Sequence, residues 1–343
     1  MKAVIVGASG YSGGELLRLL DLHPGFSVIA AIAHSQAGES ISGVHPHLTG
    51  KYPGNFTSIN SEILSEADVI FFALPHGESG RLIVEHWNAL STKKIIDLGA
   101  DFRLSSPSQW EKYYGGEHHG VWEYGLPELP GARQRISQES HIANPGCYAT
   151  ALALSIAPFA QVSGKANFED IVITAASGTS GAGRSAKVNL IGSEVMNSLS
   201  AYKVGGIHQH TPEIEAAIEG LTGGKVRLSF TPLLAPMPRG ILASVSIPIS
   251  GLSSSQLREL FAASYQNEEF VHLLPEGQSP QTNSLIGSNG VHLQVALDDH
   301  VERAIVLAAI DNLGKGAAGQ AIQNANLIAG FDEGMGLSAV GVR

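Results

Sequence analysis

The chain has a single cysteine, Cys147, among 343 residues, and Asp, Glu, Lys and Arg together make up only 15% of it. One cysteine excludes an internal disulfide and fits a reducing compartment. The net charge is −10 and no Lys/Arg run occurs, so the electrostatic footprint of a nucleic-acid-binding protein is missing. No apolar stretch reaches the ~18 residues that span a bilayer, and the sequence from Met1 runs into a strand without room for a signal peptide. We therefore expect a soluble cytoplasmic protein that binds neither nucleic acid nor a membrane.

Hydrophobic residues, by contrast, make up 43% of the chain, and the length favours two domains. The first half alternates short apolar, β-branched runs with helical segments, which predicts a doubly wound parallel Rossmann-type sheet and an α/β fold. The expected strands are 3–6, 28–32, 69–74 and 94–98, with helices beginning near Glu15 and covering 82–90.

Glycines at G-x-x-G-x-x-G spacing, Gly7, Gly10 and Gly13, lie between the first predicted strand and helix. Such a turn lets the backbone approach a pyrophosphate, which the helix N-terminus then binds, although a purely structural turn is the alternative. The second strand ends in Ala-His-Ser-Gln, with no carboxylate before Glu39. A carboxylate there usually binds the ribose of NAD, so its absence favours NADP.

The second half has apolar and polar residues alternating in several strand-like runs, which is typical of an antiparallel sheet with one solvated face. The runs are 171–174, 226–230, 242–247, 291–295 and 304–307, and helices are expected at 212–220, 256–266 and 316–329. This pattern predicts an α+β domain with a mainly antiparallel sheet.

Cys147 follows Pro145 and Gly146 and precedes a run of good helix formers, so it is predicted to lie in the first turn of a helix. The positive end of the helix dipole and unpaired N–H groups favour its thiolate, the nucleophilic form. The alternative is a buried cysteine that only packs.

Two histidines, His208 and His210, stand just before a predicted helix that Thr211 would cap and Pro212 would open. Three interpretations compete: a zinc site, two structural histidines, or a general acid/base beside the thiolate. Zinc is disfavoured because no third ligand has suitable spacing. Imidazole titrates in the range that proton transfer requires, which favours the acid/base role.

Anion-binding candidates follow two predicted strands. Residues 177–184 are rich in glycine and hydroxyls, form a candidate anion-binding nest and end in Arg184, with an interdomain turn as the alternative. Arg103 follows the strand 94–98 at the edge where α/β sheets bind ligands. It and Arg239 could bind a carboxylate or phosphate bidentately, or could simply face solvent.

Together these groups suggest one reaction. The thiolate attacks an acyl phosphate, phosphate leaves, a hydride reduces the thioester, and the thiohemiacetal collapses to an aldehyde.

Ten segments resemble the N-acetyl-γ-glutamyl-phosphate reductase family, which is related to aspartate-semialdehyde dehydrogenase. They are GASGYSGGEL (7–16), AGESISGVHPHL (37–48), FFALPHGESG (71–80), DLGADFRL (97–104), YGLPEL (124–129), ANPGCYATA (143–151), SGTSGAGR (177–184), HQHTPEI (208–214), FTPLLAPMPRGIL (230–242) and DNLGKGAAGQAIQNANL (311–327). The resemblance implies NADPH-dependent reduction of N-acetyl-L-glutamyl 5-phosphate to the 5-semialdehyde, a step of arginine biosynthesis, by a homodimer or homotetramer.

The resemblance also implies roles for residues. Cys147 would be the nucleophile, His208 or His210 the acid/base, and no metal would be needed. Cofactor-binding residues would be Gly7, Ser9, Gly10, Tyr11, Ser12, Gly13, Ser35, Ser177, Gly178 and Asn312, and substrate-binding residues Arg103, Arg184, Asn144 and Glu213. Residues 1–146 with 312–343 would form the NADP-binding domain, and residues 147–311 the catalytic and oligomerisation domain.

Two positions depart from the family pattern: His34-Ser35-Gln36 replaces a usual Ser-Arg, and Gln209 replaces a usual arginine. The first bears on the cofactor preference and the second on how substrate charge is held. Alternatives are a reductase for another amino-acyl phosphate, a Cys–His acyl hydrolase, and a non-catalytic NADP-binding sensor.

Overall fold

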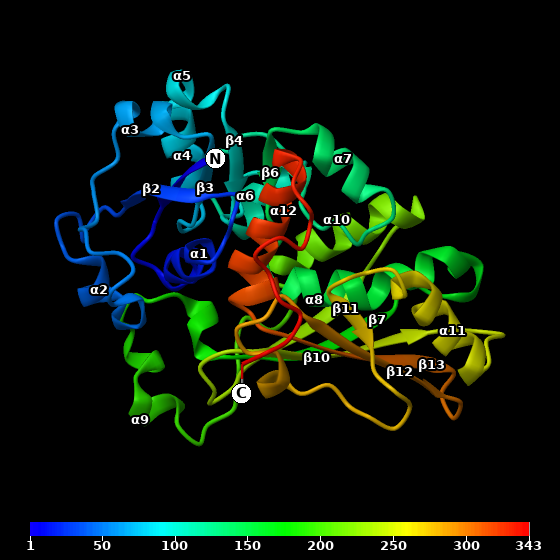
Figure 1. Cartoon of the computed structure of the whole chain (residues 1–343). Coiled ribbons are helices and arrows are strands. Elements are labelled where there is room, and N and C mark those ends of the chain that lie inside the picture. Colours follow the sequence, from blue (N-terminus) through cyan, green and yellow to red (C-terminus); the bar gives the residue numbers. More distant parts are fainter. Residues whose placement is uncertain (343) are drawn as a thin grey trace. The chain divides into compact units, whose positions relative to one another are not determined.

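A computed structural model describes residues 1–342, which form two compact units (Figure 1). The first unit comprises Met1–Pro127, Gly131–Gly146 and Ala317–Leu337. The second comprises Glu128–Pro130, Cys147–Gly316 and the chain from Ser338 onward. None of the helices in residues 1–342 combines the length and the apolar character needed to cross a membrane.

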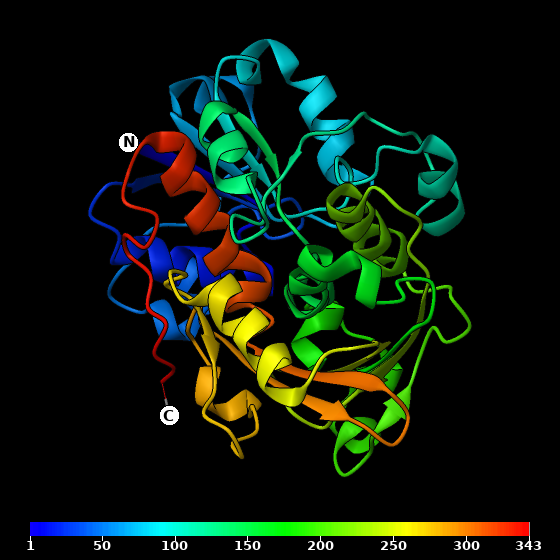
Figure 2. The same ribbon diagram turned by 90° about the vertical axis from the view of Figure 1, so that its right-hand side faces the viewer.

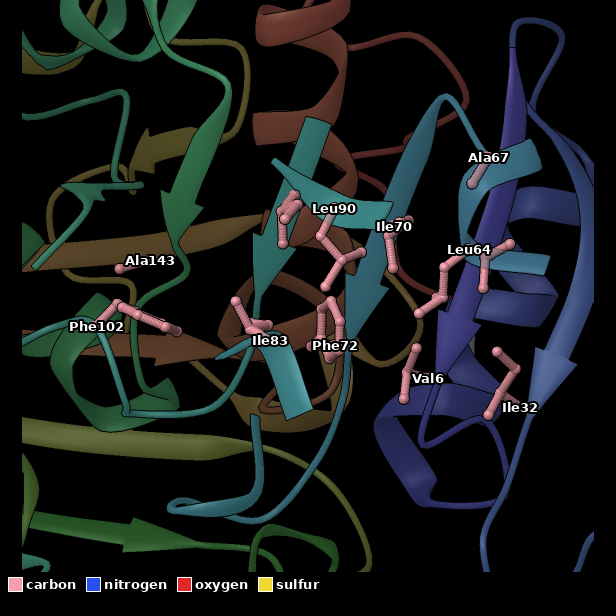
Figure 3. Packing of buried hydrophobic residues seen from close by; sticks show 12 residues of the cluster. Val6, Ile32, Leu64, Ala67, Ile70, Phe72, Ile83, Leu90, Phe102 and Ala143 are labelled. Carbon is pink, nitrogen blue, oxygen red and sulfur yellow. The ribbon is translucent and has the colours of Figure 1, made fainter. Parts of the chain in front are cut away.

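The first unit contains a six-stranded, entirely parallel sheet in the order β2-β1-β3-β4-β6-β5. Its strands are β1 (Lys2–Val6), β2 (Ser27–Ile32), β3 (Val69–Phe72), β4 (Lys94–Asp97), β5 (Glu123–Tyr124) and β6 (His141–Ala143). The four predicted strands are confirmed, whereas β5 and β6 were not predicted, since both are very short and β6 has a single β-branched residue. Apolar side chains from strands and helices pack into one core, which includes Val6, Ile70 and Phe72 (Figure 3).

The helices of this unit are α1 (Tyr11–Asp21), α2 (Ile41–Val44), α3 (Ser61–Glu66), α4 (Glu78–Glu85), α5 (Trp87–Leu90), α6 (Pro107–Tyr113), α7 (Ala132–Gln138) and α12 (Gly319–Ala329). The expected single helix 82–90 is wrong, because the chain breaks at His86 and the first part begins at Glu78. That early start depends on a distant residue: the Asp101 carboxylate accepts hydrogen bonds from the N–H groups of Gly77 and Gly80. A side-chain acceptor at a helix start replaces the missing intrahelical partners.

The second unit contains a seven-stranded sheet in the order β11-β12-β13-β10-β7-β9-β8. Its strands are β7 (Ile171–Ser177), β8 (Ser200–Ala201), β9 (Leu228–Leu234), β10 (Ile241–Pro248), β11 (Val271–Leu273), β12 (Val291–Asp298) and β13 (Arg303–Ile310). Four neighbouring pairs are antiparallel, while β7–β9 and β11–β12 are parallel. The predicted fold class, a parallel Rossmann-type sheet with a second, mainly antiparallel one, is confirmed.

One face of the second sheet is covered by helices α8 (Cys147–Ile156) and α11 (Ser254–Tyr265), and α10 (His210–Thr222) packs beside α8 (Figure 2). Alternate residues of β7 and β10 are buried against these helices. The residues between them point to the opposite face, where Val172 and Leu242 are exposed. This half-covered sheet explains the alternation seen in the sequence.

A buried carboxyl pair lies at the end of β4. Asp97 and Asp101 are both fully buried, and the N–H of Gly99 donates to Asp97 Oδ1 at 2.9 Å. Burial, reinforced by the negative charge of Asp101, raises the pKa of Asp97 from 3.8 to about 7. Between about pH 4 and 7 the folded protein therefore holds a proton that the unfolded chain has released.

Because the folded state binds more protons in that window, the contribution of Asp97 to stability falls as pH rises from 4 to 7 and is constant above it. We expect Asp97→Asn to remove this slope. The free energy of unfolding of the variant minus that of wild type should therefore be higher at pH 8 than at pH 5, by about 1–3 kcal/mol. Urea unfolding at the two pH values measures the difference. The exposed Asp299→Asn serves as control, and equal effects of Asp97→Asn at both pH values would contradict the prediction.

Candidate active site

Cys147 is the first residue of α8, as the sequence predicts. Every other residue of that helix is buried, whereas Cys147 is partly exposed. The only accessible side chain of α8 is thus a thiol at the helix N-terminus, where backbone N–H groups and the helix dipole stabilise a thiolate. This is the position that a nucleophile requires.

The segment before α12 lies directly against the cysteine. A Cβ atom added to Gly316 would come within 2.8 Å of the Cys147 Cβ, so only glycine fits there without displacing one of the two. Gly316 belongs to a π-helical turn, Gly314–Ala318, which replaces the start of the helix predicted from residue 316. Its neighbour Lys315 is fully buried and donates to Glu128 Oε1 at 2.5 Å.

The histidine pair is arranged differently from the sequence-based expectation. Helix α10 begins at His210, not at Pro212, and Thr211 does not cap it; the Thr211 hydroxyl is buried within the first turn without a hydrogen-bond partner. The N–H of His210 donates to Nδ1 of His208 at 3.1 Å. The cap position is taken by Gln209, which has a helical backbone conformation.

The charge state of His208 follows from its surroundings. Its side chain is 5% exposed, and burial, helped by His210 and Lys203, lowers its pKa from 6.5 to about 2, although Glu213 opposes the shift. His208 is therefore neutral at physiological pH. Because Nδ1 accepts a hydrogen bond, the proton is on Nε2.

Tyr148 connects the cysteine to the histidines, and sequence reasoning missed it. Its ring centroid lies 5.5 Å from that of His208 and 6.0 Å from that of His210. Its hydroxyl is within 3.2 Å of the carbonyl oxygens of Ala175 and Leu233 and accepts from the hydroxyl of Tyr202 at 3.3 Å. The only available signal was its position beside Cys147.

Both phenols remain protonated. Burial is the main cause that raises the pKa of Tyr202 to about 12 and raises that of Tyr148 further, and the negative charge of Cys147 contributes to both shifts. Cys147, His208, His210, Tyr148 and Tyr202 therefore form one cluster in the second unit. We call these five residues the thiol–imidazole cluster.

The remaining predicted residues of the second unit fall into two groups. Ser177, Gly178 and Asn312 come together: the Asn312 side chain accepts from Gly240 N–H at 2.7 Å and donates to the Ser180 hydroxyl at 2.9 Å. A Cβ on Gly178 would meet the backbone of Arg239 at 2.8 Å. By contrast Arg184 is exposed, and Glu213 is buried in the first turn of α10.

Arg239, an anion-binding candidate in the sequence, forms a bidentate ion pair with the fully buried Asp311. Asp311 also accepts from the N–H groups of Gly287 and Leu313. This pair therefore anchors the segment that carries Asn312.

In the first unit, the glycine turn joins β1 to α1. Gly7 has φ +86°, and a Cβ there would meet the Ala73 carbonyl oxygen at 2.3 Å; a Cβ on Gly13 would meet the Gly7 carbonyl oxygen at 2.4 Å. Gly10 differs, since φ is −75° and an added Cβ would have only an ordinary contact at 3.5 Å. The fold requires Gly7 and Gly13, whereas a methyl group could be accommodated at Gly10.

The other predicted cofactor residues of this unit lie in the same turn or after β2. Ser9, Tyr11 and Ser12 are at the turn and first helical residues, and Ser35 is exposed in the turn that follows β2. Arg103 uses its guanidinium to donate to the carbonyls of Asn144 and Leu98, both at 2.8 Å.

Asn144 is fully buried, and its side-chain amide bonds to Ala317 and Asn324. Within residues 1–342 no group of three or more His, Cys, Asp or Glu side chains could hold a metal ion.

Comparison with known proteins agrees with this architecture. Residues 2–138 match the family model described as semialdehyde dehydrogenase, NAD binding domain, and residues 147–312 match semialdehyde dehydrogenase, dimerisation domain. The solved aspartate semialdehyde dehydrogenase II of Vibrio cholerae, complexed with ASA, has a TM-score of 0.72 at 17% identity and covers 96% of this chain and 98% of its own. The aspartate semialdehyde dehydrogenase of Candida albicans with NADP has a TM-score of 0.68 at 16% identity and covers 96% of this chain and 98% of its own. The two matches define the class of this protein as a semialdehyde dehydrogenase with an NAD-binding domain and a dimerisation domain.

Sequence relatives narrow the assignment. N-acetyl-gamma-glutamyl-phosphate reductase of Acidothermus cellulolyticus is 52% identical over 99% of this chain and 98% of its own length. The protein of the same name from Micrococcus luteus is 49% identical, over 98% of both chains. The chain therefore belongs to the semialdehyde dehydrogenase family and, within it, to the N-acetyl-gamma-glutamyl-phosphate reductases. The resemblance inferred from the motifs is confirmed.

The space beside Gly10 leads to a test of the nicotinamide dinucleotide site. We expect Gly10→Ala to leave the free energy of unfolding within about 0.5 kcal/mol of wild type while weakening dinucleotide binding about 10-fold or more, because the methyl group would occupy the phosphate's approach. Fluorescence titration with NADPH and NADH, beside urea unfolding, measures both effects. Unchanged affinity would show that Gly10 does not line the site.

Proposed function

We propose that the chain catalyses the NADPH-dependent reduction of N-acetyl-L-glutamyl 5-phosphate to N-acetyl-L-glutamate 5-semialdehyde and phosphate, a step of arginine biosynthesis. The observation that carries this proposal is Cys147 at the accessible N-terminus of a buried helix, next in the chain to Tyr148, whose ring contacts both histidines. The names of relatives at about 50% identity support the substrate assignment. A catalytic thiol also suits the reducing conditions of the cytoplasm, where we expect the protein to act.

In the proposed mechanism the Cys147 sulfur attacks the acyl carbon, and the C–O bond to phosphate breaks, which leaves a thioester. The nicotinamide, when bound, supplies a hydride to that carbon. The resulting thiohemiacetal releases the aldehyde as the C–S bond breaks and the thiolate is restored. A thiolate suits both steps because it is a strong nucleophile and a good leaving group.

His210 is our candidate for the acid/base that protonates the substrate oxygen during reduction and receives the proton when the thiohemiacetal collapses. His208 is less suited, because its low pKa keeps it neutral and its Nδ1 is engaged by the His210 N–H. We assign His208 the positioning of His210. Tyr148 would keep Cys147 and the two imidazoles at fixed separation through its ring contacts.

We propose the following residues for binding the cofactor and the substrate. The glycine turn Gly7–Gly13, with Ser35, Ser177, Gly178 and Asn312, would bind NADP, and Arg103, Arg184, Asn144 and Glu213 would bind substrate. The exposed turn with Ser35 and no preceding carboxylate supports NADP over NAD, because a carboxylate at that place would repel the 2′-phosphate.

The function is tested in the reverse direction by phosphate-dependent reduction of NADP. We expect N-acetylglutamate 5-semialdehyde to be oxidised and aspartate semialdehyde to react at least about 100-fold more slowly in kcat/KM, since extra contacts with the acetyl group would contribute to recognition. Activity with aspartate semialdehyde alone would overturn the substrate assignment.

The covalent mechanism makes a separate prediction. Cys147→Ser should lower kcat by about 10³ or more while the Kd of NADPH stays within twofold, because the thiol attacks only the acyl group. His210→Asn should lower kcat by about 10²–10⁴, because the substrate oxygen would lose its proton donor. Full activity of Cys147→Ser would exclude the thioester. A kcat of His210→Asn within twofold of wild type would show that another group carries the proton.

We also propose that the chain forms a homodimer through the second unit, where the matched family model is named a dimerisation domain. Six large apolar residues are exposed in the stretch that leads to α10: Val188, Ile191, Met196, Leu199, Val204 and Ile207. Strand β8 lies within this stretch and is an edge strand of the sheet. A concentration of exposed apolar side chains marks an interaction surface, and the self-complementary partner is a second copy of this chain.

We expect the double variant Val188→Glu/Met196→Glu to be monomeric where wild type is dimeric, because each charge would have to be desolvated at the interface. Light scattering coupled to size-exclusion chromatography measures the mass. The matched control is Leu22→Glu, an exposed apolar residue of the first unit. A dimeric double variant, or a monomeric wild type, would contradict this surface.

A further inference from the structure

His45 is a buried histidine of the first unit, with 4% of its surface exposed, and no role follows for it from the proposed chemistry. It lies where α2 ends and the short 3₁₀ turn Pro46–Leu48 begins. We infer that His45 is a positioning residue for the dinucleotide site: it holds the glycine turn in the conformation that binds the cofactor. The inference rests on the proposed binding of the cofactor at Gly7–Gly13.

The backbone of His45 is held from both sides. Its N–H donates to the Ile41 carbonyl at 2.8 Å, and its own carbonyl accepts from Leu48 N–H at 2.9 Å. Ser40 caps α2 by accepting from Gly43 N–H at 3.4 Å. Pro46, the next residue, disfavours a helical backbone at His45, which has φ −121° and ψ 77°. The imidazole is therefore presented from a rigid corner of the chain.

The imidazole contacts the glycine turn at two points. Its Nε2 lies 2.9 Å from the carbonyl oxygen of Ala8, and because a carbonyl can only accept, Nε2 carries the proton and donates. The ring also lies against the first turn of α1: a Cβ on Gly14 would meet ring atoms Cε1 and Nδ1 at 2.6 and 2.8 Å. Gly14 is outside the G-x-x-G-x-x-G spacing, and this ring explains why glycine is needed there.

The bond to Ala8 has a geometric consequence for the phosphate-binding side of the turn. A trans peptide is planar, so its C=O and N–H point in opposite directions. With the Ala8 carbonyl directed at His45, the N–H of Ser9 points away from His45. Two neighbouring hydrogen bonds of the turn, from the Ala8 N–H to the Ile32 carbonyl and from the Gly10 N–H to the Gly7 carbonyl, belong to other peptides. The bond from His45 to the Ala8 carbonyl therefore sets the direction of the Ser9 N–H, which lies just before the N-terminus of α1.

Three substitutions of His45 distinguish the effect of its hydrogen-bond donor from the effect of its ring packing. His45→Gln keeps a donor near the position of Nε2, His45→Phe keeps a ring without a donor, and His45→Ala removes both. The control is His47→Ala, because His47 is exposed and its ring lies 5.7 Å from that of His45. We expect His45→Phe and His45→Ala to raise the Kd and the KM of NADPH 5- to 20-fold, with kcat at saturating NADPH within twofold. The Kd and KM of NADPH in His45→Gln should stay within threefold of the wild-type values, and those in His47→Ala should be unchanged.

A second readout needs no cofactor. Amide hydrogen exchange of Ser9 and Gly10 in the ligand-free protein should be faster in His45→Phe than in wild type and restored in His45→Gln. If His45→Ala does not fold, the Gln and Phe variants, which preserve more of the side-chain volume, decide the question alone. NADPH affinity within twofold of wild type in His45→Phe, or a loss confined to kcat, would overturn the inference. Should wild type itself bind no NADPH, the proposed function fails, whereas unaltered exchange in His45→Phe refutes His45 as the support of the turn.

Discussion

Helix α8 is enclosed by apolar packing along its whole length except at Cys147, its first residue, and the candidate chemistry depends on this constraint. The next residue, Tyr148, turns inward, and its hydroxyl lies against carbonyls of β7 and β9. Its ring then meets His208 and His210 at the start of α10. One helix start therefore places a thiol at an accessible surface and, through its neighbour, ties that thiol to the imidazoles.

Buried charges in both units hold backbone segments in place. Asp311 binds Arg239 and two backbone N–H groups beside Asn312, and Lys315 binds Glu128 next to the glycine that touches Cys147. Asp101 in turn fixes the start of α4. Buried charges are costly to desolvate and add little net stability, but they can specify one arrangement of the chain. Here each lies next to a segment that carries, or contacts, a candidate site residue.

The parts of the structure that local chemistry controls were predictable. Buried parallel strands are short apolar runs, and half-buried antiparallel strands alternate, so the sequence pattern located the main strands of both sheets. The helix start at Cys147 follows from Pro145 and Gly146. The errors have tertiary causes: α4 begins early because Asp101, from another segment, accepts from its N-terminus, and α10 begins at His210, where the N–H of that residue finds Nδ1 of His208.

By itself, the sequence determined the class of fold, the nucleophile's place at a helix start, the glycine turn and, through its motifs, the family. These depend on residues close together in the chain, whose periodicity and turn chemistry act locally. Only the tertiary structure decided that Tyr148 joins the cysteine to the histidines, that burial keeps His208 neutral, and that His45 supports the glycine turn from 37 residues away. Burial and long-range hydrogen bonds arise when distant segments pack together, and no local pattern encodes which side chains will then meet.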